Sequence, residues 1–457
     1  MRTCKIMTKI MKNMGSKRVK HKTKNRIGIR HTFLKPFLIT LCMVTAAGIS
    51  GMAAYRWITE PSRPVDDSHV QPAKKNIESG NDRHDAQGEK QGREQYEEKS
   101  EEQDEEQIEE ILTVNEKYAD VLNDPEYMAE NNIYVKDAAS PEEVTLAFAG
   151  DILFDDHYAV MARVMQSGGD IADGIEPDLI REMKSVDIMM LNNEFPYSDR
   201  GEPLEDKQFT FRAKTTSVAY LNDLGVDIVS LANNHAYDYG ETAFLDTIDT
   251  LEDAGIVYVG AGHNLQEARR PVYYIINDIK IAIVSATQIE RLDNPDTKGA
   301  TDTSPGVFRC WNGDNLMETI READENSDFV IAYLHWGTEN VEDIDWAQEK
   351  QAVEAVEAGA DLIIGDHPHC LQQIGVVHGV PVVYSMGNFW FSSKTLDTGM
   401  VKVTLNESGM QNCQFVACKQ SGSRTKLLHG EEKKRVLDYM QSISGDVYID
   451  EDGYVTW

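Results

Sequence analysis

Two histidines separated by one proline, His367 and His369, follow the apolar run at residues 361–365. A single histidine at such a place is more often a core or surface residue than a functional one. Two imidazoles one residue apart, at the end of a predicted strand, are the kind of side chains that hold metal ions. The segment GDHPH therefore indicates a candidate metal site.

Polar side chains follow the other apolar runs of the chain in the same way. The positions are Asp151 after 144–150, Asn192 to Glu194 after 187–191, Asn233 to His235 after 227–232, His335 after 328–334, Asp366 after 361–365, and Asn388 after 380–386. Alone, each is most simply a helix cap, a turn residue or a satisfied histidine. Because ligands of α/β proteins bind at the carboxyl ends of the strands, their coincidence predicts one shared rim.

The mixture of residue types narrows the chemistry of this rim. Carboxylates, carboxamides and imidazoles together suit Mn, Fe or Zn better than Ca or Mg alone. The six cysteines form no CxxC pair, so the sequence offers no thiolate set for a structural zinc and no sign of a disulfide-stapled fold. An open site of the catalytic type is the better interpretation.

Alternating elements must position these residues. The apolar runs are short and rich in β-branched residues, and helix-like stretches such as 242–255 and 346–360 separate most of them. Both stretches end in Gly or Gly-Ala, which is typical of a helix C-terminus. The alternation predicts an α/β fold with a largely buried sheet.

The N-terminal region has a different character. Residues 1–35 are basic, and residues 36–55 are apolar and uncharged over about the length needed to cross a bilayer. By the positive-inside rule we expect a single-pass anchor in the cell membrane, with the N-terminus cytoplasmic and the rest of the chain extracytoplasmic. The alternative is a cleaved signal peptide, because the small residues Ala46, Ala47 and Gly48 are present.

The composition of the remaining residues predicts where the linker ends and the folded domain begins. Residues 56–106 predict a disordered acidic linker, because they hold too few aliphatic residues to build a core. A helical connector is expected at 107–142, the main domain at 143–430, and a helix and hairpin that complete this domain at 431–457. The formal net charge of −32 argues against nucleic acid as a partner of the folded part.

Seven motifs occur in an order that resembles a known family. They are LAFAGD, NNEFP, FTFRAK, LANNHAYDYG, LHWGTE, GDHPHCLQ and YSMGNFWF, spread over residues 143 to 392. The pattern is similar to the CapA/PgsA family of bacterial capsule (poly-γ-glutamate) synthesis proteins. The resemblance implies a layered α/β sandwich of the calcineurin-like metallophosphoesterase type, with helices flanking the sheets.

The resemblance also implies metal ligands at six positions and a proton donor at a seventh. The ligands are Asp151, Glu194, Asn234, His335, His367 and His369, and the donor to the leaving oxygen is His235. Leu153 occupies the place of the opening histidine of the phosphoesterase pattern, and Glu194 replaces its bridging aspartate. One metal set can be complete (Glu194, Asn234, His335, His367), whereas the other is thin (Asp151, Glu194, His369). The number of ions, one or two, stays open.

Other motif residues have two interpretations each. Asp238 orients His235 from behind or simply starts the next helix, and Asn388 supports the site at a tight turn of the rim. Arg212 neutralises a phosphate or carboxylate near the site, or forms a structural salt bridge. The aromatic residues Trp336, Tyr384 and Trp390 wall the pocket or, as is more common, fill the core.

Three functions fit these observations. The first is a metal-dependent hydrolase or transferase that acts on an anionic polymer or ester at the cell surface, with His235 as general acid. The second is a non-catalytic factor that binds an anionic polymer such as poly-γ-glutamate and assists its assembly or export. The third is a domain that has lost its metal and binds partners. The resemblance also implies that other capsule-synthesis membrane subunits can be partners of this protein.

Overall fold

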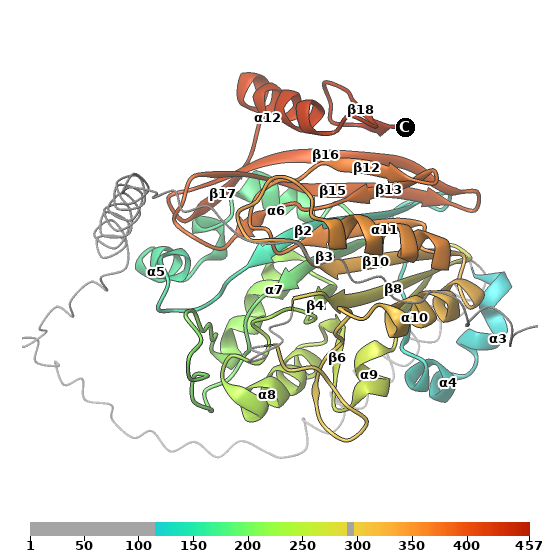
Figure 1. The fold of residues 1–457 in the computed structure, drawn as a ribbon, viewed down its shortest axis with the longest axis horizontal. Coiled ribbons are helices and arrows are strands. Elements are labelled where there is room, and N and C mark those ends of the chain that lie inside the picture. Colours follow the sequence, from blue (N-terminus) through green and yellow to red (C-terminus); the bar gives the residue numbers. More distant parts are fainter. Residues whose placement is uncertain (1–114, 290–296) are drawn as a thin grey trace, which may run out of the picture. The chain divides into compact units, whose positions relative to one another are not determined.

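The computed structural model describes residues 115–289 and 297–457 (Figure 1). Every described residue belongs to one compact unit. The predicted anchor at 36–55 and linker at 56–106 lie outside the described residues. Within the described ranges no helix is long and apolar enough to cross a membrane.

The first sheet has seven strands in the order β1-β7-β8-β10-β11-β13-β12. The strands are β1 (Ile133–Val135), β7 (Val272–Ile276), β8 (Ile279–Thr287), β10 (Phe329–His335), β11 (Leu362–Asp366), β12 (Ile374–Val377) and β13 (Val380–Val383). The central strands β8, β10, β11 and β13 run parallel to one another. These four strands are nearly continuous apolar runs because both faces of the sheet are buried.

The second sheet has eight strands, ordered β17-β16-β15-β2-β3-β4-β5, with β14 paired to β2. The strands are β2 (Val144–Ile152), β3 (Ile188–Asn193), β4 (Ile228–Ser230), β5 (Val257–Val259), β14 (Asn388–Trp390), β15 (Leu396–Asn406), β16 (Gly409–Ser421) and β17 (Arg424–Leu427). Strands β2 to β5 are parallel, and β15 to β17 extend the sheet in antiparallel fashion. The carboxyl ends of the parallel strands therefore form one edge of this sheet.

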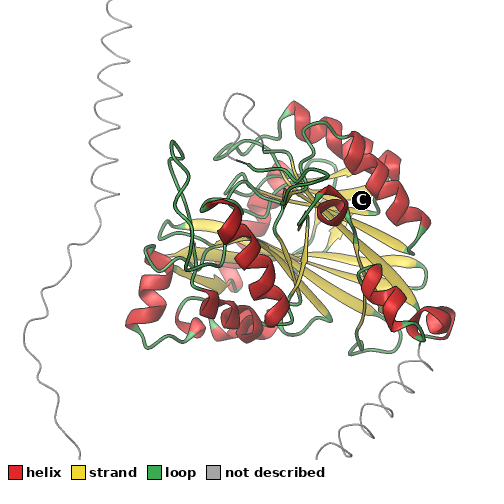
Figure 2. Ribbon diagram, turned by 90° about the horizontal axis from the view of Figure 1, so that it is seen from below, coloured by secondary structure: helices red, strands yellow, loops and turns green. Residues whose placement is uncertain are grey.

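The two sheets pack face to face. Side chains alternate along β2, so Leu146 and Phe148 join a core that also contains Ile283 and Ile331 of the first sheet. Ala147 of the same strand joins a different core on the outer face. Figure 2 shows the strands in the middle of the domain and helices on both outer sides.

Helices cover the outer face of each sheet. The second sheet is covered by α5 (Ala159–Gln166), α6 (Pro177–Met183), α7 (Ala219–Leu224) and α8 (Gly240–Asp253). The first sheet is covered by α9 (Leu265–Arg269), α10 (Asp314–Glu325) and α11 (Trp346–Ala358). The predicted layered α/β architecture with flanking helices is confirmed.

The helices expected at 242–255 and 346–360 form as α8 and α11. Helix α11 begins with a capping box, in which Asp345 accepts the backbone N–H of Gln348 and the Gln348 side chain accepts the N–H of Asp345. It ends at Gly359, whose φ of 116° lies in the left-handed region that glycine tolerates best. Local sequence signals thus set both ends of α11.

Segments at both ends of the described domain complete it. The connector contains η1 (Glu116–Tyr118), α3 (Ala119–Leu122), α4 (Pro125–Glu130) and the strand β1, which pairs in parallel with β7. The strand differs from the expected all-helical connector because Ile133 is buried against the first sheet. At the other end, α12 (Gly430–Ile443) and the hairpin of β18 (Tyr448–Ile449) and β19 (Val455–Thr456) add side chains to the core between the sheets.

The remaining short elements connect these layers. They are η2 (Ile171–Asp173), η3 (Thr215–Val218) and the two-stranded pair of β6 (Ala261–Gly262) and β9 (Gly306–Val307).

Candidate metal centre

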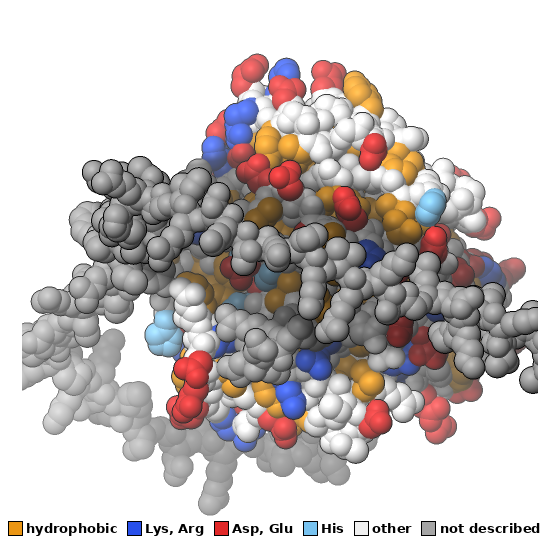
Figure 3. Space-filling view, in the orientation of Figure 1, with side chains coloured by type: hydrophobic (Ala, Val, Ile, Leu, Met, Phe, Trp, Pro, Cys, Tyr) orange, Lys and Arg blue, Asp and Glu red, His pale blue; other side chains and the backbone are white. Residues whose placement is uncertain are grey.

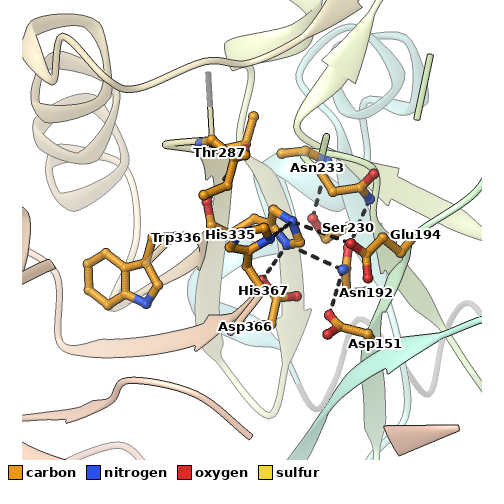
Figure 4. A network of polar contacts seen from close by, with 12 residues as sticks. Asp151, Asn192, Glu194, Ser230, Asn233, Thr287, His335, Trp336, Asp366 and His367 are labelled. Carbon is orange, nitrogen blue, oxygen red and sulfur yellow. Dashed lines mark hydrogen bonds and ion pairs between the residues drawn. The ribbon is translucent and has the colours of Figure 1, made fainter. Parts of the chain in front are cut away.

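The carboxyl ends of strands from both sheets meet at one place. Asp151 lies in β2, Glu194 directly follows β3, and Asn234 and His235 lie on the turn after β4. From the opposite sheet, His335 ends β10 and Asp366 ends β11, and His367 and His369 follow β11. Figure 4 shows Asp151, Asn192 and Glu194 on one side and His335, Asp366 and His367 on the other, directed toward one another. The structure therefore brings all six expected ligands and His235 together.

His335 joins the two sides of this centre. Its Nδ1 lies 2.8 Å from Asp366 Oδ1, so the carboxylate fixes the orientation of the ring. Its Nε2 lies 2.8 Å from Asn234 Oδ1 and 3.1 Å from His367 Nδ1. The histidine is fully buried, and its ring nitrogens contact both sheets.

Three groups of side chains could hold a metal ion. Their ligand atoms lie within 4.8 Å of one another in the sets Glu194–His335–His367, Asp151–Glu194–His369 and Asp151–His335–Asp366. The first two sets match the two sites expected from the sequence, apart from Asn234, which lies against His335. Glu194 is shared by both of them.

The burial and hydrogen bonding of Glu194 show whether these residues fit a cation. The side chain is fully buried, and neither carboxylate oxygen has a hydrogen-bond partner among the described residues. Burial, and then the nearby charges of Asp151 and Asp366, raise its pKa well above the usual value. A buried carboxylate without a partner is costly, and its neighbours are the oxygen and imidazole ligands that divalent ions prefer. The residues therefore fit a divalent metal.

The backbone around the histidine pair is strained. His367 has a φ of 91° and His369 a φ of 59°, in the left-handed region that residues other than glycine seldom adopt. Such conformations cost free energy and persist where surrounding structure holds them, often at functional sites. Gly365 packs tightly before them, since a Cβ there would lie 2.3 Å from Trp336 Nε1 and 2.3 Å from the Tyr384 carbonyl oxygen.

His235 lies at the edge of the cluster and is held from behind by Asp238. Its Nδ1 is 2.7 Å from Asp238 Oδ2, and its Nε2 is 4.0 Å from Glu194 Oε1. Burial lowers the pKa of the imidazole, and the Asp238 charge acts in the opposite direction. Of the two interpretations of Asp238, orientation of His235 matches these contacts.

Asp151 and His369 form the other side of the centre. His369 Nδ1 lies 2.9 Å from Asp151 Oδ2, and Asn192 donates from Nδ2 to Asp151 Oδ1 at 2.9 Å. Burial opposes ionisation of Asp151, but His369 and Asn192 hold its pKa below the usual value. The ion pair raises the pKa of His369 although burial lowers it.

Sequence reasoning missed several residues that support the ligands. Asp366 was noted only as a polar residue at the strand end, and the resemblance drew attention to the histidines beside it. Burial raises the pKa of Asp366 to about 6, although His335 opposes the shift. Asn233 donates to Asn192 Oδ1 at 2.9 Å and to the Asn193 carbonyl at 2.9 Å. The doubled asparagines of NNE and ANNH were the available signal.

Arg212 and Asn388 have different surroundings. The Arg212 guanidinium donates to the carbonyls of Arg200 and Gly201 at 3.2 and 3.3 Å and lies 4.2 Å from the centre of the Tyr239 ring. Asn388 begins β14 beside Asp151, and its Oδ1 is buried without a partner among the described residues. Asn388 is thus a strand partner of Asp151, and its supporting role stays a prediction.

The aromatic residues of the motifs fill the core. Trp336 and Trp390 are fully buried and Tyr384 is nearly so, and Trp336 stacks on Tyr384 with ring centres 5.6 Å apart. Leu153, at the place of the missing histidine, is buried in the core outside the second sheet. His157 is exposed and contacts Asp155 instead of the cluster. The set of Asp151, Glu194 and His369 therefore gains no further imidazole from the segment that follows β2.

Comparison with known proteins identifies the family. Residues 145–393 match the family model described as bacterial capsule synthesis protein PGA_cap. The chain belongs to this family. A capsule biosynthesis protein CapA of Bacillus anthracis is 31% identical over 309 residues, covering 65% of this chain and 72% of that protein. A PGA biosynthesis protein CapA of Bacillus subtilis (strain 168) is 30% identical over 277 residues, covering 59% and 70%.

Solved structures add little to the PGA_cap assignment. The crystal structure of TT1561 of Thermus thermophilus covers 59% of this chain and 97% of its own, with 7% sequence identity and a TM-score of 0.31. So distant a likeness carries no conclusion about the function of this chain.

Proposed function

We propose that this PGA_cap protein takes part in capsule or poly-γ-glutamate biosynthesis as a metal-dependent hydrolase or transferase that acts on an anionic polymer or ester. Membership in the family and the biosynthetic functions named for the two Bacillus relatives support the biosynthetic role. The phosphoesterase-type chemistry is what the sequence resemblance implies, and the residues of the metal centre support it.

The buried, unpartnered carboxylate of Glu194 is the observation that carries the catalytic proposal. A fold that only needed a filled core would place an apolar side chain there, because an unpaired buried charge is destabilising. The carboxylate is retained between two sets of imidazole and oxygen ligands. Divalent cations held by the two sets, with Glu194 common to both, would explain this arrangement.

The residues of the metal centre have different roles in the proposed reaction. Glu194, Asn234, His335 and His367 would hold one ion, and Asp151, Glu194 and His369 a second. A bound ion would polarise an oxygen of the substrate and neutralise developing negative charge. His235, when protonated on both ring nitrogens, donates the proton of Nε2 to the leaving oxygen, and Asp238 accepts the Nδ1–H. Asp366 keeps the His335 ring in its binding orientation.

Arg212 is the proposed contact for an anionic group of the substrate. Its guanidinium uses Nη1 for two backbone carbonyls and makes no ion pair within the described part of the chain. On the face seen in Figure 3, acidic and basic side chains are interspersed over the visible described residues. Recognition of an anion would therefore depend on individual cations such as Arg212.

Metal analysis of the purified full chain, combined with hydrolysis of diphenyl phosphate, whose phenolate leaving group needs proton donation, tests the catalytic proposal. We expect one or two divalent ions per chain, and we expect His367→Ala to reduce this number. His235→Ala should keep the metal and lose hydrolysis by about 100-fold or more. Wild-type protein that binds metal but hydrolyses no ester would contradict the catalytic role.

A non-catalytic assembly role is the second candidate, and burial of the centre favours it. Glu194 and His335 are fully enclosed, and His367 is 4% exposed, so a polymer would not reach them without rearrangement. A metal in such a place could be purely structural. Normal capsule in a strain carrying His235→Ala, but loss of capsule with His367→Ala, would favour this role.

The membrane anchor at 36–55 and an extracytoplasmic domain are part of the proposal. They make an anionic polymer at the cell surface accessible, and other capsule-synthesis membrane subunits are the proposed partners. Fractionation of cells and sequencing of the mature N-terminus test the anchor. A mature protein that begins after the segment Ala46–Gly48 would show a cleaved signal peptide instead.

A further inference from the structure

Lys207 is an unusual lysine because its side chain is only 6% exposed. Lysine is almost never fully buried unless it is paired, and Lys207 lies in the loop between β3 and η3 that passes over the His235 turn. The sequence indicated nothing special about this residue. Its contacts explain why the ammonium group leaves the solvent.

The ammonium group binds two parts of the turn that carries His235. Nζ donates to Asp238 Oδ1 at 2.6 Å and also donates to the backbone carbonyl of Asn234. The other carboxylate oxygen, Asp238 Oδ2, accepts the Phe211 N–H at 2.7 Å and contacts His235 Nδ1 at 2.7 Å. Both oxygens of Asp238 are therefore engaged, so this carboxylate cannot also bind a metal in this position.

This arrangement determines which nitrogen of His235 carries the proton. An ionised carboxylate only accepts hydrogen bonds, so His235 must donate from Nδ1 to Asp238. The proton of the neutral ring is then on Nδ1, so Nε2 is the nitrogen that must gain a proton before it can donate one to the leaving oxygen, and it faces Glu194 Oε1 at 4.0 Å. The Phe211 ring packs against the imidazole with centres 4.3 Å apart and limits its rotation.

The loop is joined to the same turn at a further point. The Leu204 N–H donates to the carbonyl of Asp238 at 2.9 Å. Leu204, Lys207 and Phe211 thus contact the turn from three positions of one loop. Of these three contacts, the lysine alone brings a charge.

We propose that Lys207 is a positioning residue for His235: it fixes Asp238 and the Asn234 backbone, and Asp238 in turn fixes the His235 ring with Nε2 toward the metal centre. The proposal rests on the proposed role of His235 as proton donor. Without the ammonium group, Asp238 loses its lysine partner and gains freedom to rotate. The His235 ring then samples orientations in which Nε2 no longer faces the centre.

The rival explanation is that Lys207 only stabilises the fold. The chain offers a matched control in Lys136, whose Nζ donates to the carbonyl of Asp187 at 2.5 Å and to the carboxylate of Asp227. The chemistry of the contacts is the same, and these partners precede β3 and β4, at the edge away from the metal centre. Lys136→Met therefore reports the effect of losing a lysine–aspartate pair alone.

Kinetics of the full chain with two phosphodiesters form the first test. One substrate has a good leaving group, 4-nitrophenolate, and the other a poor one, phenolate, which needs proton donation more. We expect Lys207→Met to lower kcat for the poor leaving group by about tenfold or more, and to change kcat for the good one much less. KM and metal content should stay unchanged, and Lys207→Arg should restore most of the loss.

Combination with His235→Ala makes the test specific. If Lys207 acts through His235, Lys207→Met has no further effect on kcat in the His235→Ala background. Lys136→Met should leave the ratio of the two substrates at the wild-type value. Equal losses for both substrates, additive losses with His235→Ala, or reduced metal content would overturn the proposal.

A second measurement does not depend on activity. Nitrogen-15 NMR of histidine-labelled full chain, with His235 assigned from the His235→Gln spectrum, reports which ring nitrogen is protonated. We expect the Nδ1–H form in the wild type and in Lys136→Met, and a mixture of forms in Lys207→Met. An unchanged His235 signal in Lys207→Met would refute the positioning role. If the wild type hydrolyses neither ester, the proposed function fails, and the NMR result still decides the role of Lys207.

Discussion

The two edges of the parallel strands carry similar residues that are used in opposite ways. Aspartates directly precede four strands at the amino edge, and acidic residues end or follow three strands at the carboxyl edge. The first set is Asp187, Asp227, Asp328 and Asp361, and the second is Asp151, Glu194 and Asp366. By residue type alone the two edges cannot be distinguished.

Hydrogen-bond partners separate the two edges. Asp187 accepts the N–H groups of Ala139 and Thr145 and the Thr145 hydroxyl, each at 2.7 Å. Asp361 accepts the N–H of Val330 at 2.8 Å, which joins the starts of neighbouring strands. At the carboxyl edge both oxygens of Glu194 and Oδ2 of Asp366 have no partner in the described residues. Satisfied carboxylates stabilise the fold, whereas the unsatisfied ones at the carboxyl edge fit a divalent cation.

Substitution of Glu194 should have the largest effect at the carboxyl edge. Glu194→Gln removes the charge shared by both metal sets, so we expect metal affinity to fall by at least about 100-fold. Stability of the metal-free protein should not fall, because the change removes an unpartnered buried carboxylate. Titration calorimetry with Mn and Zn checks the first expectation and urea unfolding the second. If Glu194→Gln kept the wild-type metal affinity, the carboxyl edge would not differ from the amino edge in metal binding.

Substitution of Asp187 should have the opposite result. Asp187→Ala leaves three donors without their acceptor, so we expect the free energy of unfolding to fall by about 3 kcal/mol. Metal stoichiometry should be unchanged. Urea unfolding together with metal analysis measures both quantities. Asp438→Ala, which removes a surface partner of Lys434, is the control and should change little.

Gly365 links the strain at the carboxyl edge to packing. Gly365→Ala would place a Cβ against Trp336 and the Tyr384 backbone, and we expect a loss of about 1–3 kcal/mol of stability. Because the neighbouring histidines must shift, metal affinity should fall as well. A thermal melt and a metal titration on the same sample test this coupling. Unchanged metal affinity in a destabilised variant would show that Gly365 serves packing alone.

The pH dependence of stability should have opposite signs for Asp366 and Asp328, one aspartate from each edge. Burial raises the folded-state pKa of Asp366 to about 6, so in metal-free protein its stability contribution is present below about pH 4 and is lost as the pH rises through 6. Burial opposes ionisation of Asp328, but contacts with Lys117 and the Lys280 N–H lower its pKa. Its contribution is therefore present above about pH 4 and is lost as the pH falls further.

Urea unfolding of metal-free protein across pH 3 to 7 resolves these two contributions. Asp366→Asn should remove the loss between about pH 4 and 6, and Asp328→Asn should reduce the loss below pH 4. The effect for Asp366 is at most about 3 kcal/mol, because one pKa unit corresponds to about 1.4 kcal/mol. The same sign in both variants would contradict the expected difference between these two aspartates.

Much of the fold was readable because strand signals are local. The runs that end at His335 and Asp366 are continuous and apolar, and α11 carries both of its end signals in its own sequence. The strand β1 was not foreseen, because three residues give too short a pattern and pairing with β7 depends on tertiary structure. Burial of Ile133 against the first sheet decides its conformation.

The candidate site was readable where motif and strand end coincide. His367 and His369 were expected at the rim because they follow β11 directly. Lys207 escaped notice because a lysine in a polar loop looks the same whether it is solvated or buried, and only the folded chain brings it to Asp238. Arg212 was expected near substrate from its motif, but the sequence could not reveal that backbone carbonyls and Tyr239 hold its guanidinium.

The first described residues contact the domain at the edge opposite the candidate metal centre. The Asp278 N–H donates to the Asn115 side chain, and Lys117 pairs with Asp328, so the chain enters at the edge where β8 and β10 begin. His335 is at the far end of β10, about 20 Å away by the rise of a strand. The preceding chain therefore joins the described domain at the end of β10 that lies opposite the candidate metal centre.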